Sequence, residues 1–260
     1  MSGPIYGKPG EEHQEHQYKR HNLGTKMIIG DRTWVYAQMG SVVGVAGNLY
    51  QSEVPKAHWN TVTVDTARAV GATQISATLG ATATVKDEFD EGYVGIEDDA
   101  GEGFLYPIAR ARAAGDANAA AASGGIQTVN LAPGYSVQVA LTTATTLSFF
   151  KHKLDEVIIH PSPATAGIVG VAMRAVTANY YCWLAIAGPT MVLAQGTLVI
   201  TDQVIASASL NGAVTPRNYT LSEATPNTMD GTQELPSLGV CLNIGATTEY
   251  ALIDLDIPGY

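Results

Sequence analysis

A period of two in hydrophobicity, repeated in many short stretches between glycine and proline turns, most limits what this chain can fold into. The stretch "WNTVTVDTA" places Val62 and Val64 on one face and threonines on the other, and "EYALIDLDI" alternates apolar residues with Asp254 and Asp256. This alternation is typical of β-strands with one buried face. The sequence therefore predicts an all-β protein with a β-sandwich or barrel-like fold, of which the jelly roll is one type.

Residues 24–40, "GTKMIIGDRTWVYAQMG", are predicted to form a hairpin. Gly30 and Asp31 supply its turn, because glycine accepts a positive φ and aspartate hydrogen-bonds its own backbone. Trp34 and Tyr36 share one face of the return strand, which we expect to be buried or to face another subunit.

Three segments are predicted along the chain. Residues 1–23 are polar and lack an apolar pattern, so they are expected to form a flexible N-terminal arm that a partner orders. Residues 24–115 and 116–260 are expected to form a first and a second β unit, with a single domain as the alternative. The boundary is placed in the small-residue stretch 109–125, which fits a short helix and an ordered loop equally well.

Charged residues are scarce: they make up 15% of the 260 residues, against about 25% in an average protein. A monomer normally needs more charge to stay apart from its neighbours, so we expect other subunits to cover much of the surface. The net charge is −10. Because residues 1–32 hold five basic and four acidic side chains, the remainder of the chain is strongly acidic, and no nucleic-acid binding is predicted.

Location and redox state can also be predicted. No apolar run approaches the roughly 18 residues of a membrane span, and the start lacks the basic and apolar regions of a signal peptide. Synthesis in a cytoplasm is therefore expected, followed either by retention there or by exit through a route other than secretion. In that reducing setting, Cys182 and Cys241 are expected to be buried free thiols.

Two groups of residues have a composition that suits metal ions. His13, His16 and His21 lie among carboxylates, but the segment lacks the rigid frame that a transition-metal site needs. The turn from Glu97 to Gly103 gathers four carboxylates but does not match the EF-hand pattern. A partner-docked arm and a solvated hairpin tip are the favoured interpretations, so neither a metal nor a cofactor is predicted.

Catalytic signatures are absent from the sequence. It contains no G-x-S-x-G, no phosphate-binding loop, no G-x-G-x-x-G that opens a helix and no H-E-x-x-H. Carboxylate pairs of the glycosidase type come together only in the fold, so a β-sandwich hydrolase stays as the least favoured alternative. The chain is predicted not to be an enzyme, and no catalytic residue is assigned.

The aromatic stretch "NYYCW" at residues 179–183 favours a role in packing and in subunit contacts, because tyrosine and tryptophan bury a large area and satisfy a polar tip. A sugar-binding platform is the alternative. Together with the polar arm and the hairpin, it supplies the candidate interface residues, namely His13, His16, Tyr18, Arg20, His21, Trp34, Tyr36, Tyr181 and Trp183.

Two parts of the chain resemble head proteins of tailed bacteriophages. The first is "GTKMIIGDRTWVYAQMGSVVGVAGNLYQS", residues 24–52, and the second is "YYCWLAIAGPTMVLAQGTLVITDQVIASASLNGAV" with "LGVCLNIGATTEYALIDLDI", between residues 180 and 257. These are strand and turn patterns, which cover about half of the chain. The resemblance implies a capsid decoration or cement protein, and that family has no catalytic residues to carry over.

The leading hypothesis is a homo-oligomer, with a trimer favoured, that binds the outer capsid surface and bridges major capsid protein subunits. It would be made in the host cytoplasm and end on the exterior of the virion. The alternative is a tail or fibre component that binds host glycans through the aromatic strand at 180–183 and the loop at 217–237. Long repetitive shafts, which are typical of fibres, are absent from the sequence.

Overall fold

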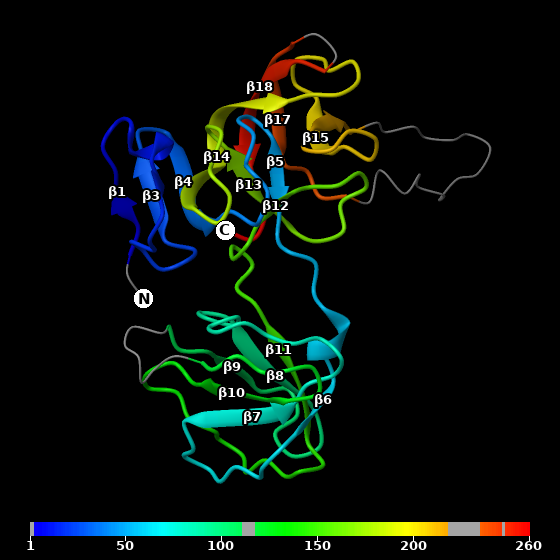
Figure 1. Cartoon of the computed structure of the whole chain (residues 1–260). Helices are drawn as coiled ribbons and strands as arrows, with labels where there is room; N and C mark the ends of the chain where they lie inside the picture. Colours follow the sequence, from blue (N-terminus) through cyan, green and yellow to red (C-terminus); the bar gives the residue numbers. More distant parts are fainter. Residues whose placement is uncertain (1–2, 111–117, 218–234, 246–247) are drawn as a thin grey trace, which may run out of the picture. The chain divides into compact units, whose positions relative to one another are not determined.

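The computed structural model of the chain describes residues 3–110, 118–217, 235–245 and 248–260 (Figure 1). The chain divides into two compact units, each of which is described by itself. Met1–Val54 and Lys153–Tyr260 make up the first unit, and Pro55–His152 make up the second. In sequence, the second unit is therefore an insertion into the first.

The first unit contains a sheet of twelve strands within its described residues. The main path runs, in spatial order, through β1 (Ile5–Tyr6), β3 (Lys26–Ile29), β4 (Arg32–Gln38), β14 (Tyr181–Leu193), β18 (Tyr250–Asp256), β17 (Gly239–Asn243), β15 (Gln203–Ala206) and β16 (Val214–Pro216). Four strands branch from it: β2 (Glu15–His16), β5 (Leu49–Gln51), β12 (Ile158–Ile159) and β13 (Ile168–Ala172). Apart from the parallel pair β1 and β3, the pairs are antiparallel.

The long strand β14 connects the two halves of the first unit. It spans 13 residues, which at about 3.3 Å per residue is a length of roughly 40 Å. Its first half pairs with β4, from Tyr181 opposite Gln38 to Ala187 opposite Thr33, and its second half pairs with β18. Segments that are far apart in the sequence therefore share one sheet.

The predicted hairpin at residues 24–40 is confirmed. Strands β3 and β4 pair with Ile29 opposite Arg32, and Gly30 has a φ of +64°, which favours glycine at the first position of a two-residue turn. The turn packs closely against β14 at Gly188, which has a φ of +89°. A Cβ atom there would lie 2.7 Å from the main-chain oxygen of Asp31, so only glycine fits.

The core of the first unit takes residues from both faces of β4 and of the first half of β14, where consecutive residues are buried, and from one face of β18. Trp34 and Tyr36 on β4, Leu184 on β14 and Ile253 on β18 are fully buried. The predicted inward row Ala251, Ile253, Leu255 and Ile257 is buried, while Asp254 and Asp256 are exposed. Burial of each large apolar side chain contributes about 1.5–3 kcal/mol, so this face holds the sheet together.

The second unit has an antiparallel sheet of six strands and a separate core. The order is β10 (Ile126–Asn130), β7 (Gln74–Thr78), β6 (Val62–Val64), β11 (Thr146–Phe150), β8 (Tyr93–Asp98) and β9 (Leu105–Pro107). Trp59, Phe89 and Phe149 pack in its core, with ring centroids about 5 Å apart: 4.9 Å for Trp59–Phe89 and 5.0 Å for Phe89–Phe149. The described residues of the whole chain contain only two short 3₁₀ helices, η1 (Glu11–His13) and η2 (Ala57–Trp59), which confirms the all-β prediction with its sandwich or barrel-like sheets.

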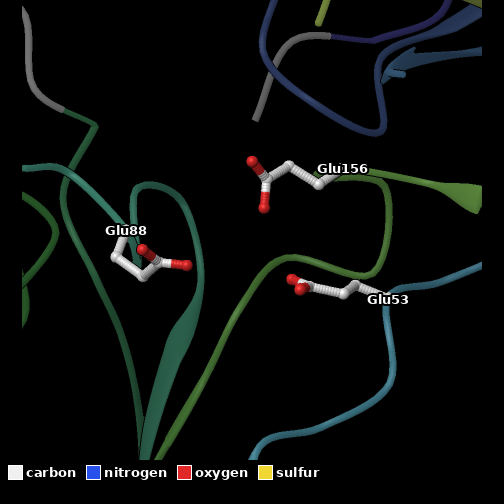
Figure 2. Close-up of side chains that lie close together, drawn as sticks. All are labelled: Glu53, Glu88 and Glu156. Carbon is white, nitrogen blue, oxygen red and sulfur yellow. The ribbon is translucent and has the colours of Figure 1, made fainter. Parts of the chain in front are cut away.

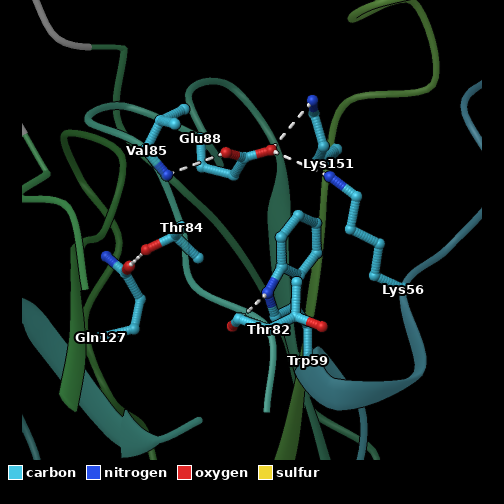
Figure 3. Close-up of polar contacts among 8 residues, drawn as sticks. All are labelled: Lys56, Trp59, Thr82, Thr84, Val85, Glu88, Gln127 and Lys151. Atoms are coloured by element: carbon cyan, nitrogen blue, oxygen red, sulfur yellow. Dashed lines mark hydrogen bonds and ion pairs between the residues drawn. The ribbon is translucent and has the colours of Figure 1, made fainter. Parts of the chain in front are cut away.

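Two ion pairs and a hydrogen bond hold the loop that carries Glu88 in the second unit (Figure 3). The Glu88 carboxylate lies 3.2 Å from Lys151 Nζ and 3.8 Å from Lys56 Nζ, and it accepts a hydrogen bond of 3.0 Å from the Val85 amide. The Lys56 ammonium also lies 4.4 Å from the centroid of the Trp59 ring. These contacts connect both ends of the inserted unit to its middle.

The observed division differs from the predicted one. The predicted boundary between residues 115 and 116 lies outside the described residues. The described part of the predicted boundary stretch belongs to the second unit, because the Asn118 amide donates to Asp87 and the Ala121 amide donates to Thr84. Each predicted unit would combine parts of both observed units, because sheet pairing joins distant segments.

The N-terminal segment also differs from the predicted arm. Ile5 and Tyr6 pair with Met27 and Ile28, and Leu23 is buried in the core of the first unit. Backbone hydrogen bonds to the sheet hold this segment without a local apolar pattern, and the sequence therefore did not reveal its docking.

Candidate functional site

Glu15 attaches the N-terminal segment to the first unit. Its carboxylate accepts hydrogen bonds from the Thr177 amide at 2.8 Å and from the Thr177 hydroxyl at 3.2 Å, and it lies 3.5 Å from the Arg174 guanidinium. Arg174 in turn donates to the carbonyl oxygen of His13 at 3.0 Å. Charge-assisted bonds to a main-chain amide are stronger than neutral ones, so Glu15 fixes β2 beside β14.

A second carboxylate, Glu12, connects the same segment to the β3–β4 hairpin. Glu12 is buried, accepts a hydrogen bond of 2.7 Å from the Gly10 amide and lies 3.7 Å from the Arg32 guanidinium. The Arg32 guanidinium also lies 4.9 Å from the centroid of the Trp34 ring. The segment is therefore held by two acidic residues as well as by Leu23, which is buried in the core.

An aromatic cluster forms where the segment passes over the beginning of β14. The Tyr36 ring lies 4.9 Å from Trp183 and stacks on Tyr181 at 5.8 Å, measured between centroids. The His21 ring lies 5.1 Å from Tyr36 and 5.4 Å from Trp183. The Tyr36 hydroxyl accepts a hydrogen bond of 3.1 Å from the Arg20 amide. Five of the nine predicted interface residues therefore lie together.

Burial separates the predicted interface residues into two classes. Trp34, Tyr36 and Trp183 are at most 4% exposed, so their side chains hold the core and cannot contact a partner in this conformation. Tyr18, by contrast, is 77% exposed, and Arg20 is exposed beside it. The part of the predicted interface that a partner can reach is therefore the N-terminal segment, together with the half-buried Tyr181.

The three N-terminal histidines do not gather around one point with carboxylates. His13 Nε2 lies 3.8 Å from Glu12, whereas His21 packs on aromatic rings. Burial, the charge of Arg20 and the neighbouring His21 lower the pKa of His16. Among the residues that the structure describes, none of these histidines belongs to a group with metal-binding spacing.

The acidic turn between β8 and β9 uses its carboxylates locally. Glu97 accepts hydrogen bonds from the hydroxyl groups of Thr61 (2.8 Å) and Ser148. Asp99 accepts from the Thr142 hydroxyl at 2.6 Å, and this bond, with help from the Ala100 amide, lowers the pKa of Asp99. These oxygens cap neighbouring strands, which agrees with a hairpin tip.

Three further carboxylates, Glu53, Glu88 and Glu156, are drawn in Figure 2. Glu53 and Glu156 belong to the first unit and Glu88 to the second, so they are considered separately. In the second unit Glu88 is engaged by Lys56 and Lys151. In the first unit, Glu53 and Glu156 have oxygen atoms within 4.8 Å of one another. Two carboxylates are fewer ligands than a protein metal site normally supplies.

Other reactive side chains serve the fold. Cys182 and Cys241 are buried free thiols, as predicted, and burial raises the pKa of Cys182 to about 12, which keeps it in the unreactive thiol form. His160 is fully buried, with its two ring nitrogens 2.7 Å from the Pro161 oxygen and 2.9 Å from the Ala213 oxygen. Its ring is therefore used in main-chain hydrogen bonding.

An exposed apolar surface on the first unit was missed by sequence reasoning. It lies where β14, β17 and β18 present their outward rows, and we call it the β17 face. Its large side chains are 37–54% exposed and comprise Met191, Ile200, Val240, Leu242, Ile244 and Tyr250. In "LGVCLNIG" apolar residues occupy both faces of the strand. A period of two in hydrophobicity therefore does not show which of the two faces is exposed.

None of the helices in the described residues is long and apolar enough to cross a membrane. Comparisons with protein-family models, with curated proteins and with solved structures find no match. The functional argument therefore depends on the residues themselves and on the resemblance of two segments to phage head proteins.

Proposed function

We propose that this chain is a non-enzymatic structural protein of a virus particle, a decoration protein that binds the outer capsid surface and bridges major capsid protein subunits. The observation that carries the proposal is the β17 face, an exposed apolar surface that suits contacts between the copies of a homo-oligomer, whose other surfaces would then meet the shell. Large apolar patches on the surface of a soluble protein mark interaction sites, and here the patch lies on a rigid sheet.

The position of the resembling segments supports this assignment. Residues 24–52 and 180–257 both belong to the first unit, on either side of the inserted unit in sequence. Strand β4 from the first segment pairs with β14 from the second, and β14 pairs with β18. The pieces that resemble head proteins therefore form one continuous sheet, as a shared fold requires.

The chemistry of the described polar groups also supports a structural role. Glu12, Glu15, Glu88, Glu97 and Asp99 each hold a neighbouring segment through hydrogen bonds or ion pairs. Groups used in this way stabilise loops and strand ends, which suits a protein that must survive outside a cell. An acidic exterior would add colloidal stability to the particle.

The experiment compares particles with and without this protein. Particles that carry it should hold it on the outside in hundreds of copies, and they should survive heat and osmotic shock better than particles that lack it. Unchanged survival together with no shell-bound copies would refute the proposal. A copy number of a few to some tens would instead favour the tail or fibre alternative, whose proposed loop at 217–237 lies largely outside the described residues.

A further inference from the structure

The β17 face has the properties of a preformed docking surface. Met191 on β14 pairs in register with Leu252 on β18, and Val240 on β17 pairs with Asp254. Three adjacent strands therefore contribute to one continuous surface. The Tyr250 hydroxyl donates to the Ala46 oxygen at 3.2 Å, so this aromatic side chain is anchored before any partner arrives.

The border of the β17 face is acidic. Asp202 lies two residues after Ile200, Glu249 precedes Tyr250, and Asp256 is exposed on β18. The exposed Asp254 lies inside the face, because β18 is the middle of the three strands and Asp254 pairs with Val240 on β17 and with Pro189 on β14. The guanidinium of Arg217, the residue after β16, donates to Gln203 on β15. A second β17 face would bring like charges together, so charge complementarity favours an apolar partner with a basic border.

The same chain carries such a surface on its N-terminal segment. Tyr18 is among the most exposed large side chains of the first unit, and Arg20 lies exposed beside it. The acidic residues nearby, Glu12 and Glu15, are occupied by Arg32 and Arg174. We call Tyr18, Lys19 and Arg20 the Tyr18 corner.

The two surfaces lie near opposite ends of β14. The segment that leads to the Tyr18 corner pairs with Tyr181, where β14 begins, whereas Tyr250 pairs with Leu193, where β14 ends. At about 3.3 Å per residue these ends are roughly 40 Å apart, so one copy cannot join its own two surfaces.

Resting on the function proposed above, we propose that the Tyr18 corner of one copy binds the β17 face of a second copy. The contact joins two different surfaces, so it is heterologous. When each copy is related to the next by a rotation that brings the last copy back to the first, repeated contacts of this kind form a closed ring such as a trimer. Stable interfaces contain about 20–30 residues on each side, so the six apolar residues of the β17 face form the centre and the charged residues form the border.

The test uses two variants of the full chain. Leu242→Glu damages the β17 face, and Tyr18→Ala with Arg20→Glu damages the Tyr18 corner. Val70→Glu, at a 63% exposed apolar position of the second unit, is the matched control. Urea unfolding verifies that all variants fold. If Leu242→Glu does not fold, Val240→Lys replaces it.

Sedimentation velocity then gives the oligomeric state at several concentrations. Wild type and Val70→Glu are expected to form the same oligomer, and each damaged variant alone should dissociate at least about tenfold more readily. A mixture of the two damaged variants should form one-to-one dimers, because the intact corner of one still meets the intact face of the other.

Three results would overturn the inference: a monomeric wild type at all concentrations, a corner variant that assembles like wild type, or a mixture without dimers. Shell binding is measured separately, by co-sedimentation with particles that lack the protein. A monomer that binds shells would overturn this inference and leave the proposed function standing. An oligomer that does not bind shells would overturn the proposed function and leave this inference standing.

Discussion

Replacement of His160 by phenylalanine tests how the first unit is held together. Both ring nitrogens of His160 contact main-chain carbonyl oxygens, those of Pro161 and Ala213, and the side chain is fully buried. The carbonyl of His160 accepts from the Gly212 amide, and the Leu49 amide donates to the Gly212 carbonyl. His160 therefore connects the β15–β16 loop to β5 and β12.

The magnitude follows from these two contacts. Phenylalanine supplies a somewhat larger ring and donates no hydrogen bond. A neutral imidazole has one N–H and an imidazolium has two, so one or two carbonyl oxygens lose a donor, and each such hydrogen bond contributes about 1 kcal/mol. The Ala213 oxygen still accepts from the Ser207 amide at 2.9 Å, which limits the loss on the buried side. We expect the free energy of unfolding of the first unit to fall by about 1–3 kcal/mol.

The assay is urea unfolding followed by tryptophan fluorescence in a Trp59→Phe background. Trp59 is the tryptophan of the second unit, so the remaining Trp34 and Trp183 report on the first unit alone. His160→Gln, which keeps a donor that can reach the buried Ala213 oxygen, should recover about half of the loss. If His160→Phe unfolds within about 0.5 kcal/mol of the parent at an unchanged slope, the reasoning is refuted.

Three further outcomes are expected. Gly188→Ala should lower the free energy of unfolding, measured in urea, by about 3 kcal/mol, because the φ of +89° and a main-chain oxygen 2.7 Å from the new Cβ both oppose a side chain. Gly10→Ala is the control: its φ is +95° but no atom lies close to the new Cβ, so the free energy of unfolding should fall by about 1 kcal/mol. Nuclear magnetic resonance titration should find the Asp99 pKa below its usual range. Since this folded-state pKa is lowered, its stabilising contribution holds above the unfolded pKa and is lost as pH falls through the folded pKa, and Thr142→Val should return the Asp99 pKa toward the usual range. A thiol reagent at pH 8 should modify Cys182 only as fast as the first unit unfolds, and rapid labelling of the folded protein would contradict the burial that raises its pKa.

Local patterns in the sequence predicted the features that depend on neighbours in the chain. The hairpin turn at Gly30 and the inward row from Ala251 to Ile257 both follow from one strand and one turn. Alternation also predicted that Asp254 and Asp256 face outward. These features need no knowledge of which strand pairs with which.

Long-range pairing determined the features that the sequence did not reveal. The insertion of residues 55–152 is visible only once β4 and β5 are seen to share a sheet with β13 and β14. The docking of Glu15 depends on Thr177, which is 162 residues away in the chain. The β17 face lies on a strand with apolar residues on both sides, where periodicity does not say which side is buried.

The order of the N-terminal segment changes what binding through it would require. A free arm pays roughly 1–2 kcal/mol of conformational entropy for every backbone residue that a partner fixes. Here Glu12, Glu15 and the Tyr36 hydroxyl already hold the segment against the sheet. The backbone that carries Tyr18 and Arg20 is thus already ordered before a partner makes contact. A small surface of this kind can then contribute most of its contact energy to affinity, because folding of the chain has already supplied the order.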